Sequence, residues 1–583
     1  MTKNQYRSNY CSELNNLVGQ KVKLAGWVRT KRDHGSMIFV DLKDKTGVAQ
    51  CIIDVSEDNF KNIENISLES VISVDGLVLQ RPENAFNDKV VSGRVEVKIE
   101  SIEVLNSSDC LPFAMHQNDV GEELRLKYRF LDLRRDEMQS RLHLRHEVIK
   151  LIRHLMESMD FIEVQTPILT SSSPEGARDY VVPSRLNPGK FYALPQAPQQ
   201  FKQLLMVSGL HRYYQIAPCF RDEDSRADRT AGAFYQLDLE MSFTTQEEVF
   251  EVLEYVMFNV FSKFKPEAKI ERTFVRIPYE EAILKYGSDK PDLRVDLRYY
   301  DVTDLFSENC PKIFEKIMKN GGKVLLLPVK DLHSKSRKFF DDMQKLVQDN
   351  GAIGLGYILL DTEVRGPLAK VVSEEVINFI KERGDGAFFI ADDISNITKY
   401  APHLIKAVGK EFDLIDEHAY KFCWIVDFPM YEKVEGKWQF SHNPFSMPQG
   451  GMEALVTQDP GSIKAFQYDL VCNGIELTSG AIRNHKLEIM YKAFEIVGYS
   501  SEDVEKEFGS MINAFKYGAP PHGGAAPGID RLVMLLAGTE NIREIIPFPL
   551  SQNGQDLMMN APTCISSKHL NELGLTVNID KNK

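Results

Sequence analysis

The stretch CFRDEDSRADRTAGAFYQLDLE, residues 219–240, decides how the middle of the chain folds. Two segments in which apolar and polar residues alternate, 214–222 and 234–243, flank a polar loop with a glycine, which is typical of an antiparallel β-hairpin. An arginine at a strand end can bind a phosphate through two hydrogen bonds, while neighbouring carboxylates orient it. The stretch therefore indicates nucleotide chemistry, with a solvated loop held by salt bridges as the alternative. Its charged residues are Arg221, Asp222, Glu223, Asp224, Arg226, Asp228 and Arg229.

The overall composition describes a multidomain globular protein. At 583 residues the chain is too long for one hydrophobic core, and a hydrophobic fraction of 43% supports folded structure throughout. No apolar run reaches the length that spans a bilayer, and the first residues lack a signal core, so we expect a cytoplasmic protein without membrane contact. Eight scattered cysteines indicate neither a zinc ribbon nor a disulfide framework. A net charge of −14 argues against nonspecific affinity for nucleic acids.

Residues 1–112 contain five short alternating segments separated by turn signals, a pattern typical of a small barrel of the OB type. Between Lys21 and Arg32 there are five basic residues and no acid, and Phe39 follows on the next segment. Cations beside an exposed ring suit single-stranded nucleic acid, because the ring stacks on a base while the cations follow the backbone. A place for Phe39 in the hydrophobic core is the alternative.

The hairpin stretch resembles motif 2 of the class II aminoacyl-tRNA synthetases, and its FRDED, RADR and QLDLE segments are similar to the aspartyl-tRNA synthetases of bacterial type. The turn differs from that form: it is one residue longer, and residues 230–233 read TAGA where a glutamate would precede the phenylalanine. In this family the turn faces the tRNA acceptor end, so the difference concerns acceptor contacts rather than ATP chemistry.

Two further stretches resemble the other class II motifs. LHLRHEVIKLIRHLMESM (142–159) has apolar residues at three- and four-residue spacing, as in a helix, and FIEVQTPILT (161–170) alternates like a strand. Together they resemble motif 1, which builds the dimer interface of these enzymes and implies a homodimer. PPHGGAAPGIDRLVMLLAG (520–538) combines a turn, a glycine-rich strand and an apolar helix, and is similar to motif 3.

The patterns and the resemblance predict a multidomain α+β protein. It would comprise an N-terminal OB-fold β-barrel, a class II catalytic domain with helices on an antiparallel sheet, and an inserted α/β module. The glycines of GAIGLG in the module do not form a dinucleotide fingerprint, because a strand-like segment follows them. The predicted boundaries are 1–112 for the barrel, 113–140 for a charged linker, 141–288 and 420–555 for the catalytic domain, 289–419 for the insertion and 556–583 for a C-terminal extension.

The resemblance implies a site for L-aspartate. Aspartate has one cation and two carboxylates, so a selective pocket needs an acid for the amine and cations for the side chain. The matching positions assign Glu175 to the amino group and Arg483 to the side-chain carboxylate, while His442 orders over the substrate. Outside this context Glu175 and Lys202 would be ordinary surface charges, and His442 could cap a turn. The implied aspartate-binding residues are Glu175, Gln199, Lys202, Arg221, His442 and Arg483.

The resemblance also implies ATP as a substrate and Mg²⁺ as a cofactor. Asp469 and Glu476 are seven residues apart, and carboxylates on neighbouring strands can point one way and hold Mg²⁺; surface charge is the alternative. Catalytic roles fall to Arg221 on the α-phosphate, Arg531 on the γ-phosphate and Glu476 as a metal ligand. Glycines let the backbone approach a nucleotide at a helix start. The implied ATP-binding residues are Arg221, Asp222, Glu223 (against the adenine), Glu476, Gly528, Ile529, Asp530 and Arg531.

The barrel would read the tRNA anticodon, with Arg32, Phe39 and Gln50 at the matching positions. His34, in place of a leucine, resembles enzymes that aspartylate both tRNA(Asp) and tRNA(Asn), whereas Asn84 stands where those enzymes tend to carry glycine. A turn histidine beside Gly35 is the alternative for His34. The expected partner is therefore tRNA(Asp), and tRNA(Asn) stays open as a second one.

These residues imply an aspartate–tRNA ligase that forms aspartyl-adenylate and pyrophosphate from L-aspartate and ATP, and then transfers aspartate to the 3′ end of tRNA. Two alternatives stay open. An asparaginyl or lysyl class II enzyme shares the barrel and motifs, but Lys202 with Arg483 suits a carboxylate better than an amide or ammonium. A catalytically silent RNA-binding relative predicts the loss of Arg221, Glu476 or Arg531, and all three are present.

Overall fold

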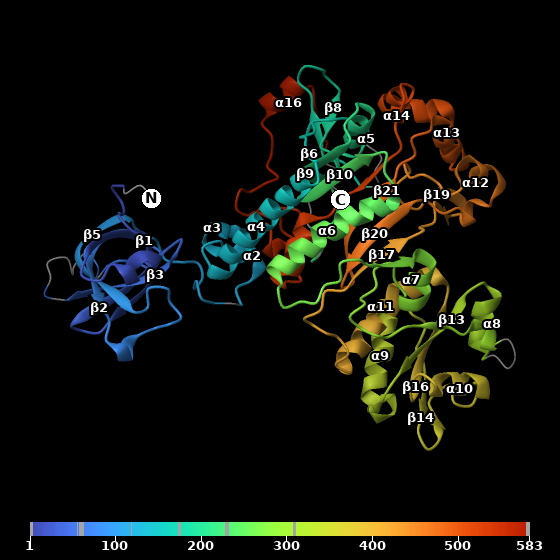
Figure 1. The fold of residues 1–583 in the computed structure, drawn as a ribbon, viewed down its shortest axis with the longest axis horizontal. Helices are drawn as coiled ribbons and strands as arrows, with labels where there is room; N and C mark the ends of the chain where they lie inside the picture. Colours follow the sequence, from blue (N-terminus) through green and yellow to red (C-terminus); the bar gives the residue numbers. More distant parts are fainter. Residues whose placement is uncertain are drawn as a thin grey trace. The chain divides into compact units, whose positions relative to one another are not determined.

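The computed structural model describes residues 4–54, 56, 63, 65–117, 119–172, 177–227, 232–306 and 311–578. It divides the chain into two units, Met1–Leu131 and Asp132–Lys583, which are described one at a time (Figure 1). The division falls within the segment predicted as a linker, 113–140. Across the described ranges, no helix combines the length and the apolar character that crossing a membrane requires.

The first unit is built on a closed five-stranded barrel in the order β1-β2-β3-β5-β4, as the alternating patterns predicted. On β2, Ile38, Val40 and Leu42 are buried in the barrel core, whereas Phe39 between them is half-buried on the outer face. The structure therefore excludes the core position for Phe39. The strands are β1 (Lys21–Asp33), β2 (Met37–Asp44), β3 (Gly47–Asp54), β4 (Val71–Gln80) and β5 (Val95–Asn106).

The segment predicted as a charged linker is largely helical. It contains α2 (Glu122–Lys127) and α3 (Arg129–Asp132), and α4 (Asp136–Ser158) begins before the predicted helical stretch at residue 142. The first turn of α4 carries two carboxylates, which the positive N-terminal end of the helix dipole stabilises, and Arg141 pairs with Glu137 one turn earlier. These local charges explain the early start of the helix.

The second unit contains an eight-stranded sheet in the order β11-β17-β20-β21-β22-β10-β9-β6. Its strands are antiparallel except for one parallel pair at each edge. Figure 1 labels β6, β9, β10, β17, β20 and β21 of this sheet. The predicted hairpin forms, and of the strand expected at 161–170 only two residues pair with β9. The strands are β6 (Ile162–Glu163), β9 (Arg212–Arg221), β10 (Gly232–Ser242), β11 (Val275–Pro278), β17 (Phe422–Val426), β20 (Gln467–Cys472), β21 (Ile475–Ile482) and β22 (His522–Ala525).

The alternation of β10 sorts its side chains onto two faces. Leu237, Leu239 and Met241 join the apolar core under helices α4, α6 (Gln246–Phe264) and α15 (Ile529–Ala537). Because successive side chains of a strand point to opposite faces, the polar residues between them turn away from these helices. One face of the sheet is thus the main core, and the other is free to form a polar site.

The insertion has its own antiparallel sheet in the order β12-β13-β16-β14-β15. Neighbouring residues of β13 enter two different apolar clusters, because α9 and α11 cover one face of this sheet and α8 and α10 the other. This explains the continuous apolar run of β13. The elements are β12 (Tyr300–Asp301), α8 (Lys312–Lys319), β13 (Lys323–Val329), α9 (Arg337–Asp349), β14 (Gly356–Leu360), β15 (Val364–Arg365), α10 (Glu374–Lys381), β16 (Gly386–Asp392) and α11 (Ile394–Glu411).

The remaining elements surround the eight-stranded sheet and complete the second unit. Their bounds are β7 (Val181–Pro183), β8 (Phe191–Ala193), α5 (Gln199–Val207), α7 (Tyr279–Tyr286), β18 (Tyr431–Val434), β19 (Lys437–Phe440), α12 (Gly451–Thr457), α13 (Leu487–Ile496), α14 (Ser501–Phe515) and α16 (Ser567–Leu573).

Candidate active site

A cavity of about 660 Å³ lies on the polar face of the eight-stranded sheet. This volume is in the range of binding sites for small ligands and cofactors. The hairpin β9–β10, helix α5, strand β21 and the start of α15 all contribute side chains to its wall. The residues predicted from sequence that line it are Gln199, Lys202, Arg221, Glu223, His442, Asp469, Glu476, Arg483, Gly528, Asp530 and Arg531.

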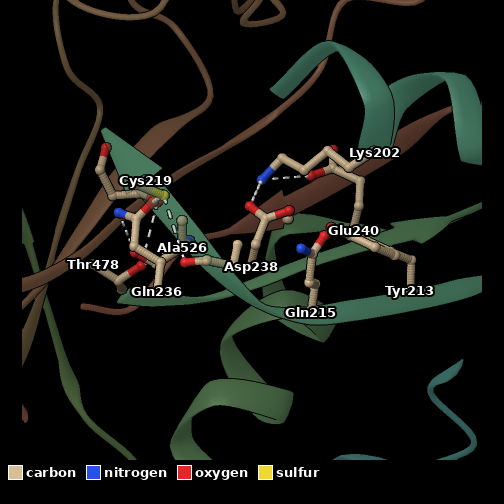
Figure 2. Close-up of polar contacts among 12 residues, drawn as sticks. Lys202, Tyr213, Gln215, Cys219, Gln236, Asp238, Glu240, Thr478 and Ala526 are labelled. Carbon is tan, nitrogen blue, oxygen red and sulfur yellow. Dashed lines mark hydrogen bonds and ion pairs between the residues drawn. The ribbon is translucent and has the colours of Figure 1, made fainter. Parts of the chain in front are cut away.

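Two buried cations, Lys202 and Arg483, form a network with two buried carboxylates at this cavity. Figure 2 shows the part that joins Lys202 to Asp238 and Glu240. Lys202 Nζ lies 2.8 Å from Asp238 Oδ1 and 3.3 Å from Glu240 Oε2. Arg483 donates from Nε to Glu240 Oε1 at 2.9 Å. Asp238 and Glu240 are not among the site residues predicted from the sequence. Their alternation with the leucines of β10 was the available signal, because it places polar side chains inside a strand on one face.

The two carboxylates are in different electrostatic states. Burial raises the pKa of Asp238 and outweighs the opposing charge of Lys202. Burial would also raise the pKa of Glu240, but the charges of Arg483 and Lys202 outweigh it, and the pKa is lowered. Asp238 Oδ2 is buried and has no hydrogen bond of ordinary geometry within the described part of the chain, while the nearby Tyr213 hydroxyl lowers the pKa of Asp238. A buried acceptor without a donor is unfavourable, so this oxygen is suited to a ligand donor.

Arg221 closes β9 and lies beside the cavity with an unused donor. Its guanidinium carbon lies 5.0 Å from the centroid of the Phe234 ring, on the paired strand β10. Its Nε is buried and makes no hydrogen bond within the described residues. The side-chain Nε2 of Gln199 is likewise buried and makes no hydrogen bond within the described residues. Both groups line the cavity, so both are placed to donate to a bound anion or carbonyl group.

Hydrogen bonds join the β9–β10 hairpin to the loop that precedes α15. Gln236 donates from Nε2 to the Ala526 carbonyl at 3.2 Å, and the Cys219 thiol donates to Gln236 Oε1 at 3.1 Å (Figure 2). The backbone N–H of Leu237 donates to the Pro527 carbonyl at 2.8 Å. These bonds fix the backbone of the glycine-rich loop against β10.

The start of α15 joins three parts of the unit. Asp530 pairs with Arg145 of α4 at 2.5 Å through one oxygen, and its other oxygen accepts from the Tyr235 N–H at 2.9 Å. Its carboxylate is therefore occupied by structural contacts. The next residue, Arg531, donates from Nη1 to the Glu476 carbonyl at 2.8 Å and lines the cavity.

Asp469 and Glu476 lie on adjacent strands of the β20–β21 hairpin and both line the cavity. Burial and the charge of Glu476 raise the pKa of Asp469 well above its usual range. Within the described ranges, no cluster of three or more His, Cys, Asp or Glu side chains has the arrangement of a metal site. Two carboxylates that face a ligand cavity fit Mg²⁺ nonetheless, because this ion commonly takes one or two carboxylates and completes its shell with phosphate oxygens and water.

His442 enters the same cavity and packs edge-on against Phe428, with 4.9 Å between the ring centroids. Burial lowers the pKa of His442 below its ordinary value of 6.5. The imidazole is therefore largely neutral at pH 7 and can donate one hydrogen bond and accept another.

Three predicted residues are absent from the described cavity wall. Asp222 points toward Arg178, with 3.9 Å between its Oδ2 and Nε of the arginine. Ile529 packs in the main core with no exposed surface. Glu175 lies outside the described residues, as do Asp228 and Arg229 of the hairpin turn.

On the barrel, four of the five predicted tRNA-binding residues lie together. Arg32 faces Phe39 across β1 and β2, with 5.9 Å between its guanidinium carbon and the ring centroid, and it donates to Gln50 at 3.2 Å. His34 meets the Phe39 ring edge-on at 5.2 Å. Asn84 is exposed in a 3₁₀ turn (Glu83–Ala85) between β4 and β5. The group presents a ring, a cation and an imidazole on the outer face.

Two parts of the chain, the barrel and the segment that forms the cavity, have sequences that match known family models. Residues 121–552 match the model of the tRNA synthetases class II (D, K and N), and residues 22–105 match an OB-fold nucleic acid binding domain. The chain therefore belongs to the class II tRNA synthetases of this D, K and N group, as the motifs predicted.

Particular relatives are similar over nearly the full chain. A Pelagibacter ubique protein described as aspartate–tRNA(Asp/Asn) ligase is 52% identical and covers 99% of this chain and 100% of its own length. A Gluconobacter oxydans protein with the same description is 53% identical, with 99% of each chain covered. The solved structure of an aspartyl tRNA synthetase from Entamoeba histolytica is 19% identical, has a TM-score of 0.58 and covers 94% of each chain, which supports the fold.

Proposed function

We propose that this chain is an aspartate–tRNA ligase that acts on both tRNA(Asp) and tRNA(Asn). The observation that carries the proposal is the cavity itself, which has two buried cations at Lys202 and Arg483 and an unpaired arginine donor at Arg221. Such a site suits a small dicarboxylate next to a phosphate chain. The relatives described as aspartate–tRNA(Asp/Asn) ligases support the same reading.

In the first step, a carboxylate oxygen of aspartate attacks the α-phosphorus of ATP, so that a mixed anhydride forms and pyrophosphate leaves. No protein nucleophile takes part, and catalysis consists of positioning and charge neutralisation. Arg221 donates to the α-phosphate through its free Nε, Glu223 reads the adenine edge, and Arg531 meets the γ-phosphate. Mg²⁺ bound by Asp469 and Glu476 would supply positive charge to the leaving pyrophosphate.

Aspartate is held by complementary charges. Lys202 and Arg483 attract its side-chain carboxylate, while the unpartnered Oδ2 of Asp238 accepts a hydrogen bond from its ammonium group. Gln199 donates to the substrate, and His442 lies over it as a neutral imidazole. The family resemblance assigns Glu175 to the same ammonium group. In the second step the terminal hydroxyl of the tRNA attacks the anhydride and releases AMP.

The choice of amino acid distinguishes this reaction from that of an asparaginyl or lysyl enzyme. We expect ATP–pyrophosphate exchange to depend on L-aspartate and to be at background with L-asparagine or L-lysine, because a site with two buried cations rejects an ammonium and leaves one cation unsatisfied by an amide. Exchange that depends on either of the other amino acids would overturn the assignment, and its absence with all three would favour a silent relative.

The tRNA specificity is tested by charging tRNA(Asp) and tRNA(Asn) transcripts side by side. We expect kcat/KM values within about tenfold of each other, because His34 lies against Phe39 on the anticodon-reading face. His34→Leu is expected to lower charging of tRNA(Asn) more than charging of tRNA(Asp), while Asn84→Gly tests the separate turn between β4 and β5. A preference of the wild type for tRNA(Asp) of about a thousandfold, roughly 4 kcal/mol, would contradict dual specificity.

We also propose a homodimer built through motif 1. The supporting observation is a set of exposed apolar side chains on the edge of the sheet and on the β7–β8 hairpin, which include Ile162 (54% exposed), Val181 (59%) and Phe191 (48%). Exposed apolar surface of this kind is typical of a contact with another chain.

If the chain forms this dimer, a charged substitution in the interface should halve the mass of the particle in solution. Ile162→Asp is expected to shift the protein from dimer to monomer in light scattering at micromolar concentration, since a charge would be buried in an apolar interface. Val456→Asp on α12, where the native side chain is 64% exposed, is the matched control and should remain dimeric. A monomeric wild-type protein would refute the homodimer.

A further inference from the structure

Lys290 is a positively charged residue near Asp469 and Glu476, and it does not belong to the eight-stranded sheet. It lies in the loop that follows α7, at the start of the segment predicted as the insertion. Asp292 and Arg294 brace this loop through a two-pronged ion pair with hydrogen bonds of 3.0 and 2.7 Å. The loop also packs on the β20–β21 turn, where a Cβ added at Gly474 would lie 3.5 Å from the Cβ of Asp292.

The ammonium group of Lys290 lies between two sets of carboxylates. Its Nζ is 2.5 Å from Asp289 Oδ2 and 3.5 Å from Glu476 Oε2. A lysine ammonium that lies between two carboxylates keeps its positive charge at neutral pH, and this charge faces Glu476 directly. Lys290 is therefore a cation beside the two residues to which we assign Mg²⁺.

We propose that Lys290 is the internal counter-cation of the Asp469–Glu476 pair and that a divalent cation must displace it from Glu476 in order to bind. The inference rests on the proposed metal-binding role of these two carboxylates. Two cations cannot share them at close range, because like charges a few ångströms apart repel strongly in a partly buried site. Without metal, Lys290 offsets the repulsion between the carboxylates.

The geometry also provides a partner for Lys290 after displacement. The contact with Glu476 is longer than the contact with Asp289 by 1.0 Å, from 3.5 and 2.5 Å respectively. The side chain can leave Glu476 and stay paired with Asp289, so displacement does not strand an unpaired ammonium. Lys290 therefore sets how tightly the empty site takes a metal ion, and it is a positioning residue rather than a catalytic one.

The test is binding of Mn²⁺ alone to the full-length protein without ATP, measured from the electron paramagnetic resonance signal of free Mn²⁺. We expect Lys290→Met to bind Mn²⁺ about tenfold more tightly than wild type, because one competing unit charge is removed from a partly solvated site. Lys290→Gln should tighten binding similarly and covers the case in which the methionine variant folds poorly. Lys290→Arg keeps the charge and should bind as wild type does.

Two further variants distinguish a failure of the metal assignment from a failure of the proposed role of Lys290. Lys285→Met removes the same charge from α7, where Lys285 pairs with Glu281 at 2.7 Å, and should leave Mn²⁺ affinity unchanged. Glu476→Gln should abolish the specific binding. If Glu476→Gln binds Mn²⁺ as wild type does, the metal assignment itself fails. If Glu476→Gln loses binding but neither neutral Lys290 variant binds more tightly, the metal site stands and the role of Lys290 is overturned.

Discussion

Arg221→Ala is expected to lower aspartate-dependent ATP–pyrophosphate exchange by about a hundred- to a thousandfold, the size of effect seen when a donor to a developing negative charge is removed. The side chain is held over Phe234 at the end of β9, and its Nε is buried beside the cavity with no partner in the described residues. No other described group with a free buried cationic donor lines the cavity. Water entering the space left by alanine would not replace a fixed charge.

The controls for this prediction separate chemistry from folding. Arg226→Ala changes an exposed arginine of the same hairpin loop and should keep exchange near the wild-type rate. Arg221→Lys keeps the charge but loses the two-pronged geometry, so it should recover only part of the activity. The melting temperature of Arg221→Ala should stay within a few degrees of wild type, because the residue makes few protein contacts that would be lost. Near-normal exchange by a folded Arg221→Ala would remove Arg221 from the proposed role.

Local patterns in the sequence predicted much of the fold. The barrel strands follow directly from alternation, because a strand with one buried face repeats every two residues and a turn must separate it from the next. The hairpin β9–β10 forms within two residues of its predicted ends for the same reason. The start of α4 was misplaced because the apolar spacing begins later than the helix, which starts at two carboxylates and an internal ion pair.

The pairing of side chains within the site could not be read from local patterns. Arg483 and Glu240 are 243 residues apart in the chain, and Arg145 and Asp530 are 385 apart. Only the folded sheet brings them together. The resemblance to class II synthetases named Lys202 and Arg483 as ligand-binding residues, but it did not predict that Asp238 and Glu240 would hold them. Lys290 carried no signal at all, since a lysine in a charged loop is usually solvated.

Lys202→Met is the second change for which we expect a large effect, and it acts on both stability and specificity. Its side chain is 2% exposed and pairs with two carboxylates, so its loss leaves Asp238 buried without its cation. Removing one partner of a buried ion pair lowers the free energy of unfolding by roughly 3–5 kcal/mol. The urea midpoint of the second unit should fall accordingly, and the KM for aspartate should rise by about a hundredfold or more because a charge-assisted contact is lost.

A double variant tells these two effects apart. In Lys202→Met/Asp238→Asn, the orphaned charge is removed together with its partner, so part of the lost stability should return, while Glu240 keeps its pair with Arg483. Aspartate activation should stay low, because the lysine that attracts the substrate carboxylate is still missing. If the double variant regained activity along with stability, Lys202 would be a structural lysine and selectivity for aspartate would have to come from Arg483 alone. Asp238 is itself assigned to the substrate ammonium, so Asp238→Asn alone, which keeps Lys202, is the matched control. If stability returns in the double variant while its activity stays well below that of Asp238→Asn, the buried ammonium of Lys202 acts on the substrate, and Glu240 serves to keep it in place.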